Sequence, residues 1–158
     1  MTAPGFTVAR LGPGDVPLLR GVNALFAEVF AEPATYAGAP PGDAYLEARL
    51  ADRSCIALVA LHEGAVIGGL VAYELRKFEQ ERSEIYIYDL AVAGMHRRRG
   101  VATRLIEAVR AIAAERGAWM IFVQADHGDE PAIALYTSLG TREDVLHFDI
   151  EPARGDRR

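Results

Sequence analysis

Residues 89–92 read Asp-Leu-Ala-Val, and residues 97–103 read Arg-Arg-Arg-Gly-Val-Ala-Thr. The first stretch ends an apolar strand, and the second is a basic loop that leads into the first turn of an amphipathic helix. Backbone N–H groups at a helix start have no partner within the helix, and the helix dipole places partial positive charge there. Gly100 and Ala102 leave this backbone open to close approach, and the arginines add positive potential. The sequence therefore predicts a phosphate-binding helix N-terminus.

The loop matches neither common nucleotide pattern, because the chain has no Gly-x-x-x-x-Gly-Lys-Ser/Thr and no Gly-x-Gly-x-x-Gly there. A basic run is also compatible with a solvated surface or with a patch that attracts nucleic acid. The formal net charge of −5 argues against general nucleic-acid binding. Every basic residue except Lys77 is an arginine, and carboxylates recur in and around the second half of the chain. If several of them line one cleft, the preferred partner is cationic.

Length and composition predict one globular domain over residues 1–152 with a disordered tail over residues 153–158. No apolar run approaches the roughly 18–20 residues of a membrane span, and the N-terminus lacks a signal-peptide pattern. We therefore expect a cytoplasmic protein. The single cysteine, Cys55, excludes an intrachain disulfide and fits a reducing compartment. It begins an apolar run, which favours a small core residue over a catalytic thiol.

Hydrophobic periodicity and turn residues predict a β-α-α-β-β-β-α-β-α-β order. The expected strands cover residues 6–11, 56–61, 66–75, 84–92, 119–125 and 145–150. The expected helices begin at Asp15, Asp43, Val101 and Pro131, and Asp15 is expected to cap the first of them. The last two helices are expected to end at Gly117 and Gly140. Residues 34–42 are expected to form a loop. This order indicates an α/β fold whose mixed sheet, of about six to seven strands, has helices on both faces.

Two side chains are candidates for acid–base chemistry. Asp89 interrupts an apolar strand, so its carboxylate must be paired or have a raised pKa. It either forms a salt bridge with an arginine, or it holds a substrate ammonium group and takes its proton. Tyr136 lies on the predicted helix that starts at Pro131, where its ring either packs against the sheet or presents its hydroxyl as an acid.

The pattern Arg97-x-x-Gly100-x-Ala102 resembles the pyrophosphate loop of the GNAT acyltransferase superfamily, and residues 132–140 resemble its Ala-x-x-Leu-Tyr-x-x-x-Gly segment. The resemblance implies acetyl-CoA as cosubstrate. It implies that the pantetheine arm pairs with the backbone of residues 90–92, and that a bulge there splays this strand from the strand over residues 121–125. It implies that the hydroxyl of Tyr136 faces the sulfur of coenzyme A. The implied cofactor-binding residues are Leu90, Ala91, Val92, Arg97, Arg98, Arg99, Gly100, Val101, Ala102 and Thr103. The chain departs from the pattern at Asp129, where asparagine is common, and at Thr141, where phenylalanine is common; Asp129 either caps the helix or adds a substrate carboxylate.

Several longer stretches look like the class I aminoglycoside 3-N-acetyltransferases, the gentamicin acetyltransferases. These stretches are residues 77–80, 82–92, 123–126, 128–129, 134–137 and 147–150. The resemblance implies acetyl transfer to the 3-amino group of the deoxystreptamine ring, a role in antibiotic resistance, and a homodimer. We expect direct transfer without an acyl-enzyme, because Cys55 is poorly placed and neither Ser83 nor Ser138 has a histidine partner in its sequence context. The candidate substrate-binding residues are Glu79, Tyr88, Asp126, Asp129, Glu130 and Asp149.

Two other functions remain open from the sequence. One is a GNAT enzyme that acetylates a different amine, such as a polyamine or a protein N-terminus. The other is a catalytically silent CoA-binding module. No metal site is expected, because the four histidines are scattered and none forms a ligand pair with another histidine or a cysteine.

Overall fold

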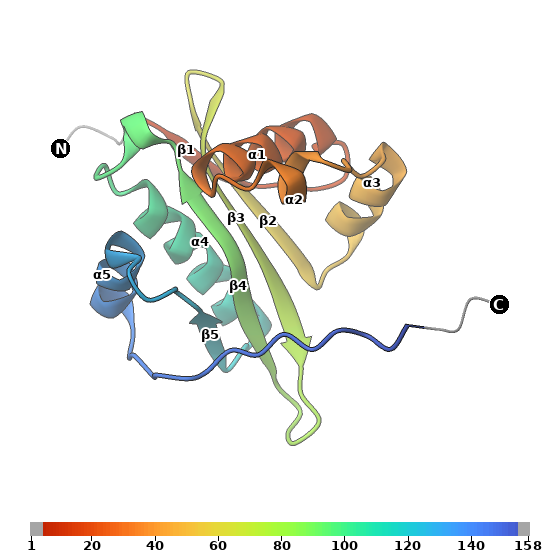
Figure 1. The fold of residues 1–158 in the computed structure, drawn as a ribbon, viewed down its shortest axis with the longest axis vertical. Coiled ribbons are helices and arrows are strands. Elements are labelled where there is room, and N and C mark those ends of the chain that lie inside the picture. The colour runs from red at the N-terminus through yellow and green to blue at the C-terminus, as the bar shows by residue number, and fades with distance from the viewer. Residues whose placement is uncertain (1–4, 155–158) are drawn as a thin grey trace. The chain divides into compact units, whose positions relative to one another are not determined.

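The computed structural model describes residues 5–154, which fall into two compact units that meet in sequence between Gln124 and Ala125 (Figure 1). In chain order the elements of the first unit are β1 (Thr7–Arg10), α1 (Val16–Val29), α2 (Pro33–Ala37), α3 (Asp43–Ala51), β2 (Cys55–His62), β3 (Ala65–Arg76), β4 (Ser83–Val92), the 3-10 turn η1 (Gly94–His96), α4 (Val101–Arg116) and β5 (Met120–Val123). The second unit contains α5 (Glu130–Leu139).

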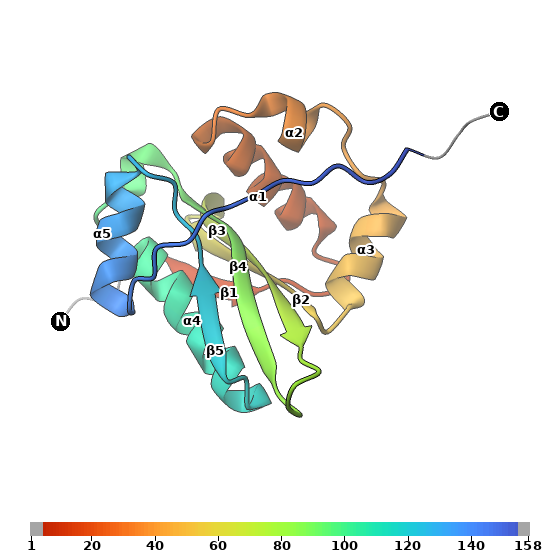
Figure 2. The same cartoon turned by 60° about the horizontal axis from the view of Figure 1, so that its bottom comes forward.

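The first unit is built on one five-stranded sheet in the order β1-β2-β3-β4-β5. The pairs β1–β2, β2–β3 and β3–β4 are antiparallel, whereas β4 and β5 are parallel. The sheet is therefore mixed, as predicted. Helices α1, α2 and α3 lie over one face and α4 covers the other, which Figure 2 shows after a turn of 60°. The α/β fold class and the helices on both faces are confirmed.

Two adjacent glycines on β3 show how closely the helices approach the two faces. A Cβ atom on Gly69 would lie 2.5 Å from a methyl group of Val22 on α1, and one on Gly68 would lie 2.9 Å from a methyl group of Val101 on α4. Successive residues of a strand point to opposite faces, so the two layers meet the sheet back to back at this point. Larger side chains at these positions would push the helices away from the sheet.

Glycine residues also define both ends of α4. Gly100 is the N-cap at φ 77°, and Gly117 is the C-cap at φ 67°, both in the left-handed region that favours glycine. The predicted stop at Gly117 is confirmed. Between them the buried side chains of the helix recur at three- and four-residue spacing: Val101, Leu105, Ile106, Val109 and Ala113.

The chain between α1 and α3 is more ordered than expected. The loop predicted over residues 34–42 begins with the single-turn helix α2, which has Pro33 in its first turn. Proline has a preset φ and needs no N–H partner at that position, so it favours a helix start that a loop assignment overlooks. Asp15 occupies the N-cap position of α1, but its side chain accepts a hydrogen bond from the N–H of Gly12 at 2.8 Å instead of capping the helix.

In the second unit, α5 begins after Asp129 and ends before Gly140, as predicted. The prediction of a strand at residues 145–150 is wrong. Because this strand is missing, the sheet has five strands among the described residues and not six. The segment alternates like a strand, but a strand forms only where a second strand pairs its N–H and C=O groups. Four apolar side chains of this segment are instead strongly exposed: Val145, Leu146, Phe148 and Ile150.

The predicted tail lies partly outside the described residues, since the description ends at residue 154. Residues 153 and 154 belong to no helix or strand. A single domain over residues 1–152 stays a prediction. Within residues 5–154, no helix combines the length and the apolar composition that crossing a membrane requires.

Candidate functional site

The edge of β4 that faces β5 is open along its last residues. The parallel pairing of β4 with β5 ends at Ile87 opposite Val123, and β4 continues to Val92. Beyond Ile87 no strand of the described chain pairs with this edge. Such an edge can accept an extended ligand through main-chain hydrogen bonds, as an added strand would. The stretch predicted to bind pantetheine, Leu90 to Val92, lies on this open edge.

A bulge in β4 precedes the open edge. Ala72 on β3 pairs with Ile87 and Val71 pairs with Asp89, so Tyr88 is an extra residue in the ladder. The bulge predicted from the resemblance is therefore present, two residues before Leu90. Because one extra residue shifts the alternation of side chains, Tyr86 and Tyr88 lie on the same face of the sheet as Asp89.

Aromatic rings cover this face around the bulge. The rings of Tyr86 and Phe122 stack with centroids 4.5 Å apart, and Tyr88 contacts Tyr86 and Tyr73 edge-on at 5.5 and 5.9 Å. The hydroxyl of Tyr86 donates a hydrogen bond to the side-chain oxygen of Gln124 at 2.8 Å, which fixes that ring. Tyr88 remains 62% exposed, so the cluster presents a broad aromatic surface next to Asp89.

Asp89 is half-buried and has one hydrogen-bond partner among the described residues. Its Oδ1 atom accepts a hydrogen bond of 2.7 Å from the hydroxyl of Tyr36 on α2. Burial raises the pKa of Asp89 above its ordinary value, the hydrogen bond from Tyr36 partly offsets this shift, and the negative charge of Glu32 adds to it. Burial and the contact with Asp89 in turn raise the pKa of Tyr36, so its hydroxyl stays protonated.

The sequence left open a salt bridge between Asp89 and an arginine, and this alternative is wrong. None of the salt bridges within residues 5–154 includes Asp89. The groups that act on its pKa are a phenol and a second carboxylate rather than a cation. A partly desolvated carboxylate without a countercharge favours a cation that arrives from solution.

The predicted phosphate loop has the geometry that an anion requires. Arg98 and Gly100 both have positive φ, 60° and 77°, and residues 97–100 are exposed. In the described chain the N–H groups of Val101, Ala102 and Thr103 have no hydrogen-bond acceptor. A Cβ atom on Gly100 would meet no atom within 4 Å, so the chain is not crowded at the residue that precedes these groups. The loop can therefore cradle a phosphate with backbone N–H groups.

Two of the predicted cofactor residues make contacts within the protein that limit how they can meet a ligand. The side chain of Val101 is buried under the sheet, so only its backbone is available to a ligand. The Nε atom of Arg97 donates a long hydrogen bond, 3.4 Å, to the carbonyl oxygen of Val92. This contact links the loop to the end of β4.

In the second unit, Tyr136 lies half-buried on α5. Burial and the nearby carboxylate of Asp129 raise the pKa of Tyr136 to about 12. The side chain of Asp129 accepts a hydrogen bond from the N–H of Ala132 at 3.3 Å, which confirms the capping role that the sequence allowed for it. At this pKa the phenol stays protonated at neutral pH and is a weaker acid than an ordinary tyrosine.

The remaining candidate carboxylates have different environments. Glu79 lies in the connection between β3 and β4, and two cations approach it: Lys77 at 3.8 Å and Arg82 at 3.5 Å. Asp149 in the second unit lies 2.9 Å from His147. Asp126 and Glu130 are exposed and enter no salt bridge within the described residues. Their contact with a substrate stays a prediction, and Glu79 is the least available of them.

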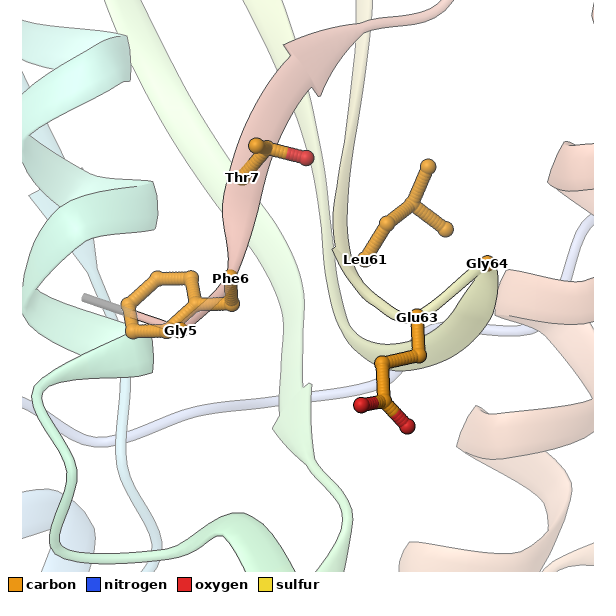
Figure 3. A pocket seen from close by; sticks show the side chains of 6 residues that line it. All are labelled: Gly5, Phe6, Thr7, Leu61, Glu63 and Gly64. Carbon is orange, nitrogen blue, oxygen red and sulfur yellow. The ribbon is translucent and has the colours of Figure 1, made fainter. Parts of the chain in front are cut away.

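A pocket of about 320 Å³ opens at a different place in the first unit, between the start of β1 and the β2–β3 hairpin (Figure 3). Its lining residues are Gly5, Phe6, Thr7, Leu61, Glu63 and Gly64. None of them belongs to the predicted site, and Glu63 is the only titratable group of the lining. We therefore place the candidate site at the open edge of β4 and not in this pocket.

Sequence reasoning missed Tyr36 as a partner of Asp89. The two residues are 53 positions apart, and α2 itself was assigned to a loop. Pro33 indicates a helix start at α2, but no local pattern joins Tyr36 to Asp89. No group of three or more histidine, cysteine or acidic side chains within residues 5–154 has the arrangement of a metal site.

An open strand edge followed directly by a helix start whose N–H groups have no acceptor in the described chain is an arrangement that can hold a coenzyme A thioester. The chain belongs to the acetyltransferase (GNAT) family, whose model matches residues 23–141. The protein is thus an acetyltransferase of a family that uses acetyl-CoA.

Solved structures extend this similarity over nearly the whole chain. An aminoglycoside acetyltransferase, HMB0005, from an uncultured soil metagenomic sample is 54% identical, with a TM-score of 0.92 over 97% of this chain and 100% of that one. A second such enzyme, meta-AAC0020, also from an uncultured soil sample and in complex with sisomicin, is 31% identical, with a TM-score of 0.86 over 94% and 97%. Among curated proteins, an uncharacterized N-acetyltransferase, YhfO of Bacillus subtilis, is 29% identical over 108 residues, 67% of this chain and 72% of its own length.

Proposed function

We propose that this protein transfers the acetyl group of acetyl-CoA to the 3-amino group of aminoglycoside antibiotics and thereby confers resistance to them. The observation that carries the proposal is Asp89, a half-buried carboxylate at the open edge of β4 that has no cation partner within residues 5–154. Aminoglycosides carry several ammonium groups, and the similarity to two aminoglycoside acetyltransferases supports this substrate class. Acetylation removes one positive charge that such a drug needs at its ribosomal target.

Acetyl-CoA supplies an activated acetyl group as a thioester. The N–H groups from Arg98 to Thr103 would hold its pyrophosphate, with Arg97, Arg98 and Arg99 adding positive potential. The open edge of β4 from Leu90 to Val92 would hold the pantetheine arm, and backbone N–H groups of this edge would polarise the thioester carbonyl. The unpaired edge and the free N–H groups fit this ligand.

The transfer is direct, without an acyl-enzyme. Asp89 binds the substrate ammonium group and takes its proton, directly or through water, because only the neutral amine can attack a carbonyl carbon. The new C–N bond forms as the C–S bond breaks, and the second proton of the nitrogen leaves to solvent. Tyr136 donates a hydrogen bond to the departing sulfur. With a pKa of about 12, this phenol stabilises the thiolate mainly by hydrogen bonding, and solvent completes its protonation.

The aromatic surface beside Asp89 fits a sugar ring with amino groups. Tyr88 offers an exposed ring, and an aromatic face attracts cations through its quadrupole. The exposed acidic side chains Asp126, Glu130 and Asp149, together with Asp129, add negative potential that attracts polycations over a long range. A peptide N-terminus carries one ammonium group and would gain less from such a field.

We also propose that the protein works in the cytoplasm as a homodimer. The exposed apolar side chains of residues 145–150 support an association between copies, because monomers rarely leave such a run in water. Light scattering coupled to size-exclusion chromatography measures the mass directly. A mass near the monomer value of 17.1 kDa at micromolar concentration would contradict the dimer.

The function is tested with purified protein, acetyl-CoA and a panel of amines that includes gentamicin, sisomicin, kanamycin and spermidine, with thiol release as the readout. We expect turnover with gentamicin and sisomicin, and NMR of the product should place the acetyl group on the 3-amino nitrogen. Asp89→Asn keeps the shape of the side chain and should lower kcat/KM by about 10²–10⁴ at neutral pH. The matched control is Asp52→Asn, an aspartate that follows α3 and whose side chain bonds to Ser54 and not to Asp89 or Tyr36.

Each rival function predicts a different result in the same panel. Preference for spermidine or for a peptide N-terminus would replace the substrate class and leave the family intact. Tight acetyl-CoA binding without turnover on any amine would indicate a silent binding module. Acetylation of a different aminoglycoside nitrogen would refute the 3-N assignment alone.

A further inference from the structure

Tyr36 reaches Asp89 from a separate element of the first unit. It lies on the single-turn helix α2, and its ring is held by two phenylalanines of α1: Phe26 at 5.8 Å edge-on and Phe30 at 5.5 Å between ring centroids. Phe26 is completely buried in the core. Aromatic contacts of this kind fix the ring plane, so the hydroxyl has a defined position when it donates to Asp89.

The hydrogen bond distinguishes the two oxygen atoms of Asp89. Oδ1 accepts the 2.7 Å hydrogen bond from Tyr36, whereas Oδ2 has no partner among the described residues. The Asp89 carboxylate belongs to β4, and the bulge at Tyr88 sets the face to which it points. One oxygen is thus engaged by the protein while the other keeps its capacity to accept a proton.

We propose that Tyr36 is a positioning residue for Asp89, whose hydroxyl binds Oδ1 and leaves Oδ2 as the atom that takes the proton from the substrate amine. The inference rests on the proposed function, because it assumes that Asp89 is the base. Tyr36 touches neither the reacting nitrogen nor the thioester in this scheme. It acts through Asp89, by orienting the carboxylate and by stabilising its ionised form.

The charge environment of Asp89 makes this hydrogen bond important. Four titratable groups either shift the pKa of Asp89 or have their own pKa shifted by Asp89. They belong to α2, to the residue just before α2, to β3 and to β4. They are Tyr36, Glu32, Tyr73 and Tyr86, and none of them is a cation. Burial and Glu32 disfavour the ionised carboxylate, so the Tyr36 hydroxyl is the one protein group among them that favours it.

The test is the pH dependence of kcat/KM for Tyr36→Phe, which removes the hydroxyl and keeps the ring between Phe26 and Phe30. Loss of the hydrogen bond raises the pKa of Asp89, so the acid limb of the profile should move to higher pH by about one unit. At a pH below the acid limbs of both the parent protein and the variant, this shift corresponds to about a tenfold loss of kcat/KM. A carbon-13 carboxyl titration by NMR, in which Asp89→Asn identifies the signal, should show the same shift without any substrate.

Tyr45→Phe is the matched control. Tyr45 lies on α3 and is 59% exposed, and its hydroxyl makes no hydrogen bond within the described residues, so removing it should leave the acid limb in place. Thermal unfolding of both variants should agree with the parent protein within a few degrees. A uniform loss of activity across all pH values in Tyr36→Phe, without a shift of the limb, would mean a merely structural role and would overturn the proposal.

The proposal and the proposed function fail in different ways. If Asp89→Asn abolishes the acid limb while Tyr36→Phe leaves both the limb and the NMR titration unmoved, Asp89 remains the base and Tyr36 is not its positioning residue. If Asp89→Asn retains the activity and the acid limb of the parent protein, Asp89 is not the base, and the role of Tyr36 fails with it.

Discussion

The two glycines at the ends of α4 provide a paired test of the phosphate loop. Gly100 and Gly117 have nearly the same backbone conformation, at φ 77° and 67°, and a Cβ atom on either would meet no atom within 4 Å. Replacing either by alanine places an L-residue in the left-handed region, which costs about 1–2 kcal/mol. For a chain of this length such a loss lowers Tm by about 2–8 °C. Both variants should therefore lose a similar amount of stability.

Binding of acetyl-CoA should separate them. The new methyl group of Gly100→Ala lies at the N-terminal end of α4, where the N–H groups of Val101 to Thr103 have no acceptor in the described chain, whereas that of Gly117→Ala lies at the opposite end of the helix. Loss of one hydrogen bond to a charged phosphate costs about 1.5–3 kcal/mol. This corresponds to an increase in the acetyl-CoA KM of about ten- to a hundredfold.

The assay is thiol release at a saturating amine concentration with acetyl-CoA varied, and calorimetric titration with coenzyme A gives Kd independently. Gly117→Ala should keep both constants within about twofold of the parent, a free-energy change below about 0.5 kcal/mol. Equal changes in the two variants would show that the effect is a loss of stability and not of phosphate contact. An unchanged Kd in Gly100→Ala would refute the assignment of the pyrophosphate to this loop.

Three further changes should give measurable results. Tyr136→Phe should lower kcat less than Asp89→Asn does and leave the substrate KM nearly unchanged, because solvent can protonate the thiolate. Stopped-flow thiol release measures this. A larger loss than in Asp89→Asn would show that departure of the thiolate, and not proton removal by Asp89, limits the rate. The aminoglycoside KM should rise steeply with NaCl in steady-state assays, since the Debye length falls to about 3 Å at 1 M salt, and a KM insensitive to salt would contradict attraction by carboxylates. Arg116→Met should destabilise the fold by about 3–5 kcal/mol in urea unfolding, because it leaves the buried Glu74 without its cation, and a loss below about 1 kcal/mol would contradict this.

The Arg116 pair also sets a pH dependence. Although burial raises the pKa of Glu74, hydrogen bonds from Ser83 and Arg116 outweigh this effect and lower it. A carboxyl group with a lowered folded-state pKa stabilises the fold above its unfolded pKa, near 4.3 for glutamate, and this contribution is lost as the pH falls through the folded-state pKa. Urea unfolding of the parent protein should show this loss, and the same series on Arg116→Met should not.

Local signals explain which parts of the fold were predictable. Gly117 and Pro131 act within one turn of a helix end, so their effect is readable from the sequence alone. The contact between Tyr36 and Asp89 joins residues 53 positions apart and depends on how α2 packs, which no local pattern encodes. The strand expected at residues 145–150 failed for a related reason, because alternation indicates the propensity to pair and not the presence of a partner.

The candidate site was predictable to a similar degree. The end of β4 and the start of α4 were predicted because each lies in a continuous stretch with its own pattern, whereas ligand binding there stays a prediction. The surroundings of Asp89 were not, since a buried carboxylate predicts that it has a partner but not whether that partner is an arginine or a phenol. Only the structure distinguishes a neutralised carboxylate from one that still attracts a cation.

The extra residue in β4 also determines which changes of length the chain tolerates. Removing Tyr88 alone would make the pairing regular and leave Asp89 opposite Val71 on its present face, because Ile87 and Asp89 already pair with the adjacent residues Ala72 and Val71. One codon lost from the gene beyond the bulge, between Leu90 and Val92, would instead reverse the orientation of every later side chain in the strand. The exposed turn at Glu63 and Gly64 carries no such constraint, because a longer loop would leave the register of β2 and β3 intact. Natural variation in length should therefore accumulate at that hairpin and be absent from the end of β4 beyond the bulge.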